Sequence, residues 1–343
     1  MVTIDGSRGE GGGQVLRTSL SLSLLTGQPF RMIRIRAGRP KPGLQRQHLV
    51  AVHAAAEVGR AQVSGAELGS HEITFVPGEL RAGDYEFHIS GAGSTTLVLQ
   101  TILLPLLHAA RPSTVRLTGG THNPFAPPYE FLDQVFAPLL RRMGAEATMS
   151  LRRPGFYPAG GGDISVRVAP CAHLAPIQLL ERGPVRRIRA FAYVARLPRQ
   201  IAERELTTLR ERFALGPEHV QLIEVPESPG PGNAVSVQIE AQHVTELFTA
   251  FGQRGVPAER VAAAVADEAQ EYLAAGVPVG RHLADQLLLP LVLAGAGSFR
   301  TQPLSKHAQT NCGVIGQFLQ VPIKTTCAAD GSVRVDVGQA LSG

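Results

Sequence analysis

Three apolar segments that share a pattern are spread along the chain. Ile102-Leu103-Leu104-Pro105-Leu106-Leu107 closely matches Leu287-Leu288-Leu289-Pro290-Leu291-Val292, and Leu20 to Leu25 is a looser third copy. Each copy is too apolar to be a surface helix, so each predicts a helix buried in a core. Self-similarity of this kind favours a repeated unit of strands and two helices. We therefore expect an α/β fold in which one large domain is built from three repeats.

The interval between the second and third copies is about twice the interval between the first and second, which indicates an insertion. Within it, alternating apolar residues and helical periodicity predict a small α/β domain of its own. Its elements are expected as strands at 185–194, 220–225 and 234–240, with helices at 199–213 and 258–274. We therefore place the inserted domain at 184–276 and the large domain at 1–183 and 277–343.

The rest of the large domain follows from the same patterns and from glycine and proline at the ends of segments. A basic strand is expected near Ile33 and Ile35, with both isoleucines facing the core and Arg34 and Arg36 facing away. A C-terminal hairpin is expected at 328–337, with Asp330-Gly331 as its turn. The other expected elements are helices at 15–25, 49–58, 95–110 and 130–143 and strands at 72–76 and 84–89.

Composition and charge add little to this fold but bear on location and partners. The 343 residues carry a net charge of +5, which is a weak sign of an anionic partner. The first residues lack the basic start and apolar run of a signal peptide, and no apolar stretch is long enough to cross a bilayer. The three cysteines, Cys171, Cys312 and Cys327, form no C-x-x-C pair and are interpreted as reduced thiols. We expect no membrane association and a cytoplasmic location.

A glycine-rich segment, Gly6 to Gln14, leads into the first helix. Bare glycine backbone lets a phosphate approach N–H groups, and the helix start adds its positive dipole end. The segment lacks the Gly-Lys-Ser/Thr of a Walker loop, and Gln14 replaces the third glycine of a dinucleotide fingerprint. A simple tight turn is an equal alternative. Glu10, a carboxylate among glycines, favours a site for a hard cation such as Mg²⁺.

The next segment is strongly basic and contains no acidic residue. From Arg31 to Arg46 the chain has five arginines and one lysine. Such a run is often only a solvated face. The planar arginine fork is suited to bidentate phosphate contacts, so the excess of arginine over lysine favours phosphate binding.

Two polar segments near the C-terminus contain candidate reactive groups. Pro303 to Asn311 has His307 at its centre, and Asp285 stands in the segment Arg281 to Gln286 at the start of the last apolar helix. We interpret His307 as a nucleophile in a polar loop, with Asp285 in the same pocket. The alternatives are a surface histidine and a carboxylate that only stabilises a helix start. Proline-rich Asn123 to Tyr129 is either a rigid turn or one wall of a base pocket.

Taken together, five motifs identify a family. They are D-G-x-x-G-E-G-G-G-Q-x-L-R at Asp5 to Arg17, R-A-G-R-x-K-P-G-L at Arg36 to Leu44 with Gln47-His48, F-Y-P-A-G-G-G at Phe156 to Gly162, L-A-D-Q at Leu283 to Gln286, and His307 with Thr310-Asn311. The chain resembles the RNA 3′-terminal phosphate cyclases over essentially its whole length. The resemblance implies a large domain of three βαβαββ-like units with a smaller inserted α/β domain, similar in architecture to the enolpyruvyl transferases.

The resemblance also implies a reaction with ATP, a divalent metal ion (Mg²⁺ or Mn²⁺) and an RNA that ends in a 3′-phosphate. A histidine attacks the α-phosphorus of ATP to give a histidinyl-AMP adduct, and AMP then passes to the RNA 3′-phosphate. The neighbouring 2′-hydroxyl displaces AMP and closes a 2′,3′-cyclic phosphate. The covalent adduct stores the activation between the steps.

The resemblance assigns roles by matching positions. His307 is the implied nucleophile and Glu10 the implied metal ligand. Two departures are His282, where relatives commonly have Tyr against the adenosine, and Lys306 beside His307, a cation that would lower the pKa of the histidine or contact a phosphate. The implied phosphate-binding residues are Arg17, Arg36, Arg39, Gln47 and His48, and the implied nucleotide-binding residues are Gln100, Pro127, His282, Leu283, Ala284, Asp285 and Gln286.

Two alternative functions remain on the sequence alone. One is a non-catalytic, cyclase-like RNA-binding factor in ribosome maturation, a branch that lacks the histidine present here. The other is a small-molecule transferase of the same architecture that uses the arginines for phosphorylated metabolites. Only the cyclase would form an AMP adduct.

Overall fold

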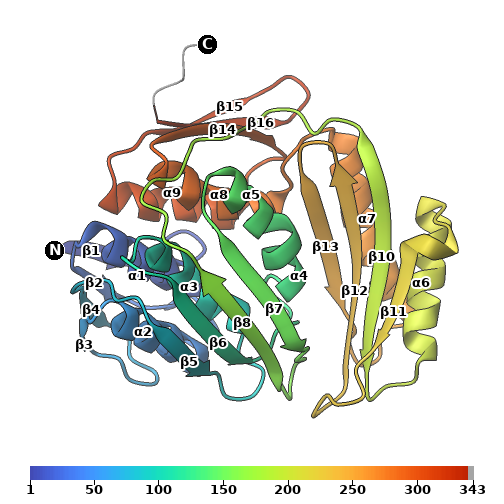
Figure 1. Cartoon of the computed structure of the whole chain (residues 1–343), viewed down its shortest axis with the longest axis horizontal. Helices are drawn as coiled ribbons and strands as arrows, with labels where there is room; N and C mark the ends of the chain where they lie inside the picture. The colour runs from blue at the N-terminus through green and yellow to red at the C-terminus, as the bar shows by residue number, and fades with distance from the viewer. Residues whose placement is uncertain (339–343) are drawn as a thin grey trace.

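The computed structural model describes residues 1–338, and the large domain within them consists of three units with one topology (Figure 1). In the first unit the sheet order is β1-β2-β4-β3, with β1 parallel to β2 and the other pairs antiparallel. Its helices connect β1 to β2 and β2 to β3. The elements are β1 (Val2–Asp5), α1 (Gly13–Thr26), β2 (Phe30–Ile33), α2 (Arg46–Val58), β3 (Gln62–Ser64) and β4 (Ile73–Val76).

The second unit repeats this order as β5-β6-β8-β7, again with one parallel pair and two antiparallel pairs. Its second helix is divided by a π-helical turn, Leu132–Phe136. The elements are β5 (Asp84–His88), α3 (Thr95–Leu107), β6 (Ser113–Gly119), α4 (Tyr129–Phe131), α5 (Ala137–Arg142), β7 (Ala147–Arg153) and β8 (Gly162–Val168).

The third unit has the order β9-β14-β16-β15 and the same pairing, so the predicted βαβαββ repeat is confirmed. The three predicted apolar segments lie in α1, α3 and α8, the first helix of each unit. The elements are β9 (Gln178–Leu179), α8 (Arg281–Leu293), β14 (Ala296–Thr301), α9 (Lys306–Phe318), β15 (Ile323–Cys327) and β16 (Val333–Gly338).

The inserted domain enters the third unit between its first strand and its first helix, β9 and α8. It has a separate sheet, β11-β10-β12-β13, and a separate apolar core beneath α6 and α7. Figure 1 shows it beside the three units, on the side of α4 and α5. Its elements are β10 (Val185–Ala195), α6 (Gln200–Phe213), β11 (Val220–Glu224), β12 (Gly232–Ala241), β13 (Thr245–Phe251) and α7 (Ala258–Ala275). The strand β13 was not predicted, and the boundaries at residues 184 and 276 stay a prediction.

The expected basic strand is wrong beyond Ile33. The strand β2 ends there, and the chain turns with Arg34 and Arg36 at positive φ of 53° each. Ile35 is nevertheless buried, at 1% exposure, because the turn folds it back into the core. Alternation of apolar and basic residues indicated burial correctly but did not distinguish a strand from a turn.

Two further expectations need correction. Residues 303–311 are not a loop, because α9 starts at Lys306 and the Ser305 hydroxyl accepts the Ala308 N–H at 3.1 Å as its N-cap. In the C-terminal hairpin the Asp330-Gly331 turn is as predicted, but the first strand, β15, ends at Cys327, before the expected start. Both errors are in boundaries, which depend on caps and on turn geometry.

Other expectations concern membranes and thiols. None of the helices within residues 1–338 is long and apolar enough to cross a membrane. Cys171, Cys312 and Cys327 are free, as expected.

The inserted domain is joined to the start of α8 by a buried carboxyl group. Glu246 on β13 is 1% exposed and accepts the backbone N–H of Gly280, the N-cap of α8, at 2.6 Å. Burial raises the pKa of Glu246 to about 8. The folded protein therefore retains a proton that an unfolded Glu releases near its ordinary pKa.

We expect this carboxyl group to destabilise the fold as pH rises from about 4.5 to about 8, because the folded state binds the extra proton over that window. Glu246→Gln should remove that loss and raise the urea midpoint at pH 8.5 by the equivalent of about 1 kcal/mol or more, at about 1.4 kcal/mol per pKa unit. Urea unfolding on both sides of the window measures this. The exposed Glu227→Gln is the control, and an equal pH dependence in wild type and Glu246→Gln would contradict the assignment.

Candidate active site

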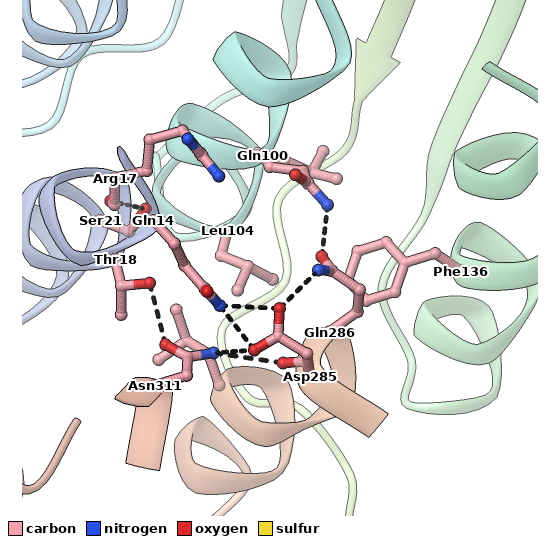
Figure 2. A pocket seen from close by; sticks show the side chains of 12 residues that line it. Gln14, Arg17, Thr18, Ser21, Gln100, Leu104, Phe136, Asp285, Gln286 and Asn311 are labelled. Carbon is pink, nitrogen blue, oxygen red and sulfur yellow. Dashed lines mark hydrogen bonds between the residues drawn. The ribbon is translucent and has the colours of Figure 1, made fainter. Parts of the chain in front are cut away.

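Three helices from two repeats meet at one buried carboxylate. Asp285 on α8 is 8% exposed and accepts two hydrogen bonds from the Gln14 amide on α1, at 2.6 and 2.7 Å. Asn311 on α9 donates to the same carboxylate at 3.1 Å and accepts from the Thr18 hydroxyl at 2.9 Å. Figure 2 shows this network in the cavity between the helices. The positions of α1, α8 and α9 are therefore tied together through Asp285.

This network also orients His307. Its Nδ1 lies 2.6 Å from the Oε1 of Gln14. The amide nitrogen of Gln14 is already directed at Asp285, so the oxygen must face the histidine, and an amide oxygen only accepts. The proton of a neutral His307 ring therefore sits on Nδ1. Its Nε2 carries the free lone pair, on a side chain that is 55% exposed.

The electrostatic surroundings of His307 favour the neutral ring. Burial lowers its pKa, and the charges of Arg17, Arg39 and His282 lower it further, while Asp285 opposes them. Glu10 stands close, with its Oε2 2.9 Å from His307 Nδ1, and it also forms an ion pair with Arg39. A ring that gained positive charge during a reaction would find that carboxylate on its Nδ1 side.

A basic recess adjoins this histidine at the start of α1. Arg17 lines the same cavity as Gln14, and burial lowers its pKa to about 10, which leaves it charged at neutral pH. Gly13 has no side chain, and a Cβ there would come within 2.4 Å of His48 Nε2 and 3.1 Å of an Arg17 nitrogen. Glycine at this position therefore keeps the ends of both side chains open to a ligand.

His48 is held in a fixed orientation by the cap of α2. Its Nδ1 accepts the backbone N–H of Gln45 at 3.0 Å, so the neutral ring presents an N–H at Nε2. Burial lowers its pKa to about 3, helped by the charges of Arg17 and Arg36. His48 is thus a neutral hydrogen-bond donor at the recess and not a cation.

On the other side of Asp285 the cavity continues between α3, α8 and the π-helical turn. Gln100 on α3 donates to the Oε1 of Gln286, and Gln286 donates to Asp285 at 3.1 Å. The ring of Phe136 lies against this group in Figure 2. The whole cavity measures about 70 Å³ and combines amides, a carboxylate, an arginine and apolar side chains.

Comparison with known proteins gives one consistent result. Residues 8–325 match the model of the RNA 3′-terminal phosphate cyclase family. The chain is similar to proteins named RNA 3′-terminal phosphate cyclase from Ectopseudomonas mendocina and from Ralstonia nicotianae. These are 49% and 52% identical over 338 residues, which cover 98% of this chain in both cases and 98% and 97% of the relatives.

The chain belongs to the RNA 3′-terminal phosphate cyclase family. Among solved structures, the enolpyruvyl transferase NikO from Streptomyces tendae gives a weak likeness. It is 19% identical over 50% of this chain and 33% of its own, with a TM-score of 0.29. The evidence for the three repeats in this cyclase-family chain is the sheet topology itself, which is the same in all three units.

The structure brings together most of the residues that the sequence predicted for the site. One group surrounds His307 and the recess, and the other lies around Asp285. Together they are Glu10, Arg17, Arg39, His48, Gln100, Asp285, Gln286 and His307. Arg36 is half-buried and donates to the carbonyls of Lys41 and Gly43 in its own loop, from where its charge acts on His48. Gln47 lies in the first turn of α2, beside Gly93.

Four predicted residues stand differently. Leu283 and Ala284 are both 0% exposed, and their side chains pack in the core outside the cavity lining, so their assignment as nucleotide contacts stays a prediction. The carbonyl of Pro127 accepts a hydrogen bond from the Thr96 hydroxyl at 2.8 Å. Thr96 precedes Gln100 by one turn of α3. His282 is exposed and lies 3.0 Å from Glu268 on α7 of the inserted domain. Motif membership does not indicate which helix face a residue occupies.

The sequence missed Thr18 and Phe136 as lining residues. Thr18 follows Gln14 by four positions, so helical spacing would have placed both on one face of α1. Phe136 gave no comparable signal, because it belongs to a helix whose regular spacing is broken by the π-helical turn. Lys306 is exposed, and its effect on His307 stays a prediction.

The site offers few ligands to a divalent metal ion. Within residues 1–338 no group of three or more His, Cys, Asp or Glu side chains could hold one. Glu10 supplies one carboxylate beside His307. One carboxylate fits Mg²⁺ only where substrate phosphates and water complete the shell.

We expect neutral His307 to carry its proton on Nδ1, because the Gln14 oxygen accepts it there. Long-range ¹H–¹⁵N spectra of the imidazoles distinguish the two tautomers, and His307→Ala identifies the signals. Gln14→Ala should shift population toward the Nε2-protonated form, whereas the exposed Gln253→Ala should not. A wild-type ring protonated on Nε2 would contradict this hydrogen bond from His307 to Gln14.

Proposed function

We propose that this chain catalyses the ATP-dependent conversion of an RNA 3′-phosphate into a 2′,3′-cyclic phosphate, through a covalent histidinyl-AMP intermediate. Membership of the cyclase family supports the overall reaction. The observation that carries the mechanism is His307, whose Nε2 lone pair is free while its Nδ1 is held by Gln14 and faces Glu10.

In the first step, the Nε2 of His307 attacks the α-phosphorus of ATP. A P–N bond forms, the bond to the β-phosphate oxygen breaks, and pyrophosphate leaves with the electron pair. No base is required, because the attacking nitrogen carries no proton. The ring becomes positively charged, and the Glu10 carboxylate and the Asp285–Gln14 pair stabilise that charge from the Nδ1 side.

In the second step, an oxygen of the RNA 3′-phosphate attacks the same phosphorus and His307 leaves as a neutral imidazole, which gives RNA(3′)pp(5′)A. In the third step, the 2′-hydroxyl attacks the 3′-phosphorus, loses its proton and displaces AMP. We assign the terminal phosphate to the recess of Arg17, His48 and Gly13, where a cation, a fixed N–H donor and the α1 N-terminus converge.

The nucleotide is assigned to the cavity of Gln100, Gln286 and Phe136 beyond Asp285. We propose that Pro127 and His282 flank the base, as the family resemblance implies, although His282 then has to leave Glu268.

Glu10 would hold a divalent ion together with phosphate oxygens, and such an ion neutralises phosphate charge. The consumption of ATP and the free cysteines of the chain both fit a cytoplasmic location.

The two alternative functions are weaker. A non-catalytic RNA-binding factor has no use for a histidine whose tautomer and charge are both set for attack. A small-molecule transferase would use the arginine recess but would form no adduct with AMP.

We expect wild-type protein with ATP labelled at the α-phosphate to acquire acid-labile, alkali-stable label, and His307→Ala to acquire none. Gln14→Ala should reduce the rate of labelling by about tenfold or more, because the ring loses its fixed orientation. Gel analysis of the chain after incubation with Mg²⁺ or Mn²⁺ measures both. Unlabelled wild type, or undiminished label on His307→Ala, would exclude the mechanism.

We expect Arg36→Ala and Arg39→Ala to lower cyclisation by tenfold or more and to weaken RNA binding. Where each arginine neutralises one phosphate, the slope of log affinity against log salt should fall by about 0.7 per substitution. Titration of a 3′-phosphorylated RNA at several salt concentrations measures this slope. The exposed Arg111→Ala is the matched control, and unchanged slopes in all three variants would argue against phosphate contacts by this segment.

A further inference from the structure

A second cavity lies between the inserted domain and the large domain. It measures about 200 Å³, and no step proposed above uses it. One wall is the face of the inserted sheet that points away from α6 and α7, with Arg189, Phe191 and Tyr193 on β10 and Gln238 on β12. The intervening residues Ala190, Ala192 and Val194 pack beneath the helices in the domain core. The alternation of β10 thus gives this sheet one apolar face and one face of aromatic, amide and guanidinium groups.

The opposite wall comes from the second repeat. Glu130 on α4 and Gln134 in the π-helical turn line the cavity there. The walls are joined by direct contacts, because the Tyr193 hydroxyl donates to Glu130 at 2.7 Å and Gln238 donates to Gln134 at 2.7 Å. Glu130 is also held by buried His122 at 2.9 Å. The cavity is therefore preformed, with its two sides in a fixed relation.

The chemistry of the lining fits a nucleobase. Half-buried Phe191 offers a ring, and exposed Gln221 on β11 offers an amide with both a donor and an acceptor. Aromatic stacking combined with hydrogen bonds to the base edge is how proteins bind unpaired RNA bases. The volume is below the roughly 300–1,000 Å³ of sites for drug-sized ligands, which suits a single base.

The charges favour a base inside the cavity and phosphates outside it. The carboxylates of Glu130 and Glu218 line the cavity, and Glu218 lies 3.2 Å from His219. These groups disfavour a buried phosphate. Near the start of β10, Arg187 and the lining residue Arg189 share one carboxylate, Glu240, which leaves a surplus of positive charge for an RNA backbone at this side of the cavity.

The two cavities share one segment of chain. Phe136, the last residue of the π-helical turn, lines the first cavity, and Gln134 in the same turn lines the second. In Figure 1 the α4 region lies between α8 and the inserted sheet. The second cavity therefore lies on the other side of the π-helical turn from the first.

We propose that this cavity binds an unpaired base of the RNA substrate upstream of its 3′-terminal nucleotide, with Phe191 as the stacking surface and Gln221 as the edge-reading group. The inference rests on the proposed function in that it concerns the same substrate. It gives the inserted domain a role in substrate binding, separate from the chemistry at His307.

Two substrates and two variants test this proposal. Phe191→Leu keeps an apolar side chain but removes the ring, and Gln221→Ala changes an exposed residue, so both should fold. For a 3′-phosphorylated oligouridylate, each variant should raise KM by about fivefold to tenfold with kcat unchanged. For uridine 3′,5′-bisphosphate, which is too short to reach the cavity, wild type and variants should have the same KM. Gln253→Ala, an exposed glutamine of the inserted domain outside the cavity, is the matched control.

A measurement without chemistry separates this proposal from the proposed function. Oligouridylates with 4-thiouridine at single upstream positions should photo-crosslink to the peptides of Phe191 or Gln221 even in the His307→Ala protein. Crosslinks at these peptides in a wild-type protein that does not cyclise RNA would retain the base site and reject the cyclase function. Cyclisation with equal KM for both substrates in all variants, and crosslinks elsewhere, would overturn the base site. A raised ATP requirement for labelling in Phe191→Leu would also overturn it, because the cavity would then serve ATP.

Discussion

The candidate active site depends on the hydrogen bonds to one buried carboxylate, that of Asp285. Burial raises its pKa, and its hydrogen bonds to Gln14 and Asn311, together with the charges of His307 and Arg17, oppose that shift. A buried charge needs such partners, because desolvation is costly without them. Since the partners come from α1 and α9, the requirement to satisfy one carboxylate aligns helices of the first and third repeats and directs Gln14 at His307.

The site contains two histidines, His48 and His307, whose neutral rings are held as opposite tautomers. His48 presents an N–H at Nε2 because the cap of α2 occupies its Nδ1, whereas His307 presents a lone pair at Nε2 because Gln14 accepts from its Nδ1. Burial and nearby arginines lower the pKa of both histidines, which favours the neutral form of each ring. In the proposed mechanism, one side-chain type thus supplies both a hydrogen-bond donor for a phosphate and a nucleophile for a phosphorus atom, and the group that each Nδ1 contacts decides which.

The repeat explains how such a site arises from distant segments. Each unit places its first helix, α1, α3 or α8, in the shared core, and residues of all three helices line a common cavity. The insertion interrupts the third unit directly before α8, and β13 of the inserted sheet packs against α4 and the π-helical turn of the second unit. Contacts such as Glu246 with Gly280 and His282 with Glu268 connect the inserted domain to the start of α8.

The sequence alone determined the repeat, the inserted α/β domain and the family, because apolar periodicity and short motifs are local properties of the chain. It also indicated that Ile35 is buried, although not that it lies in a turn. Only the tertiary structure decided which motif residues face the cavity: Leu283 and Ala284 point into the core, while Asp285 beside them faces Gln14, 271 positions away. The tautomer of His307 and the second cavity were likewise inaccessible to sequence, because each depends on contacts between segments that no local pattern encodes.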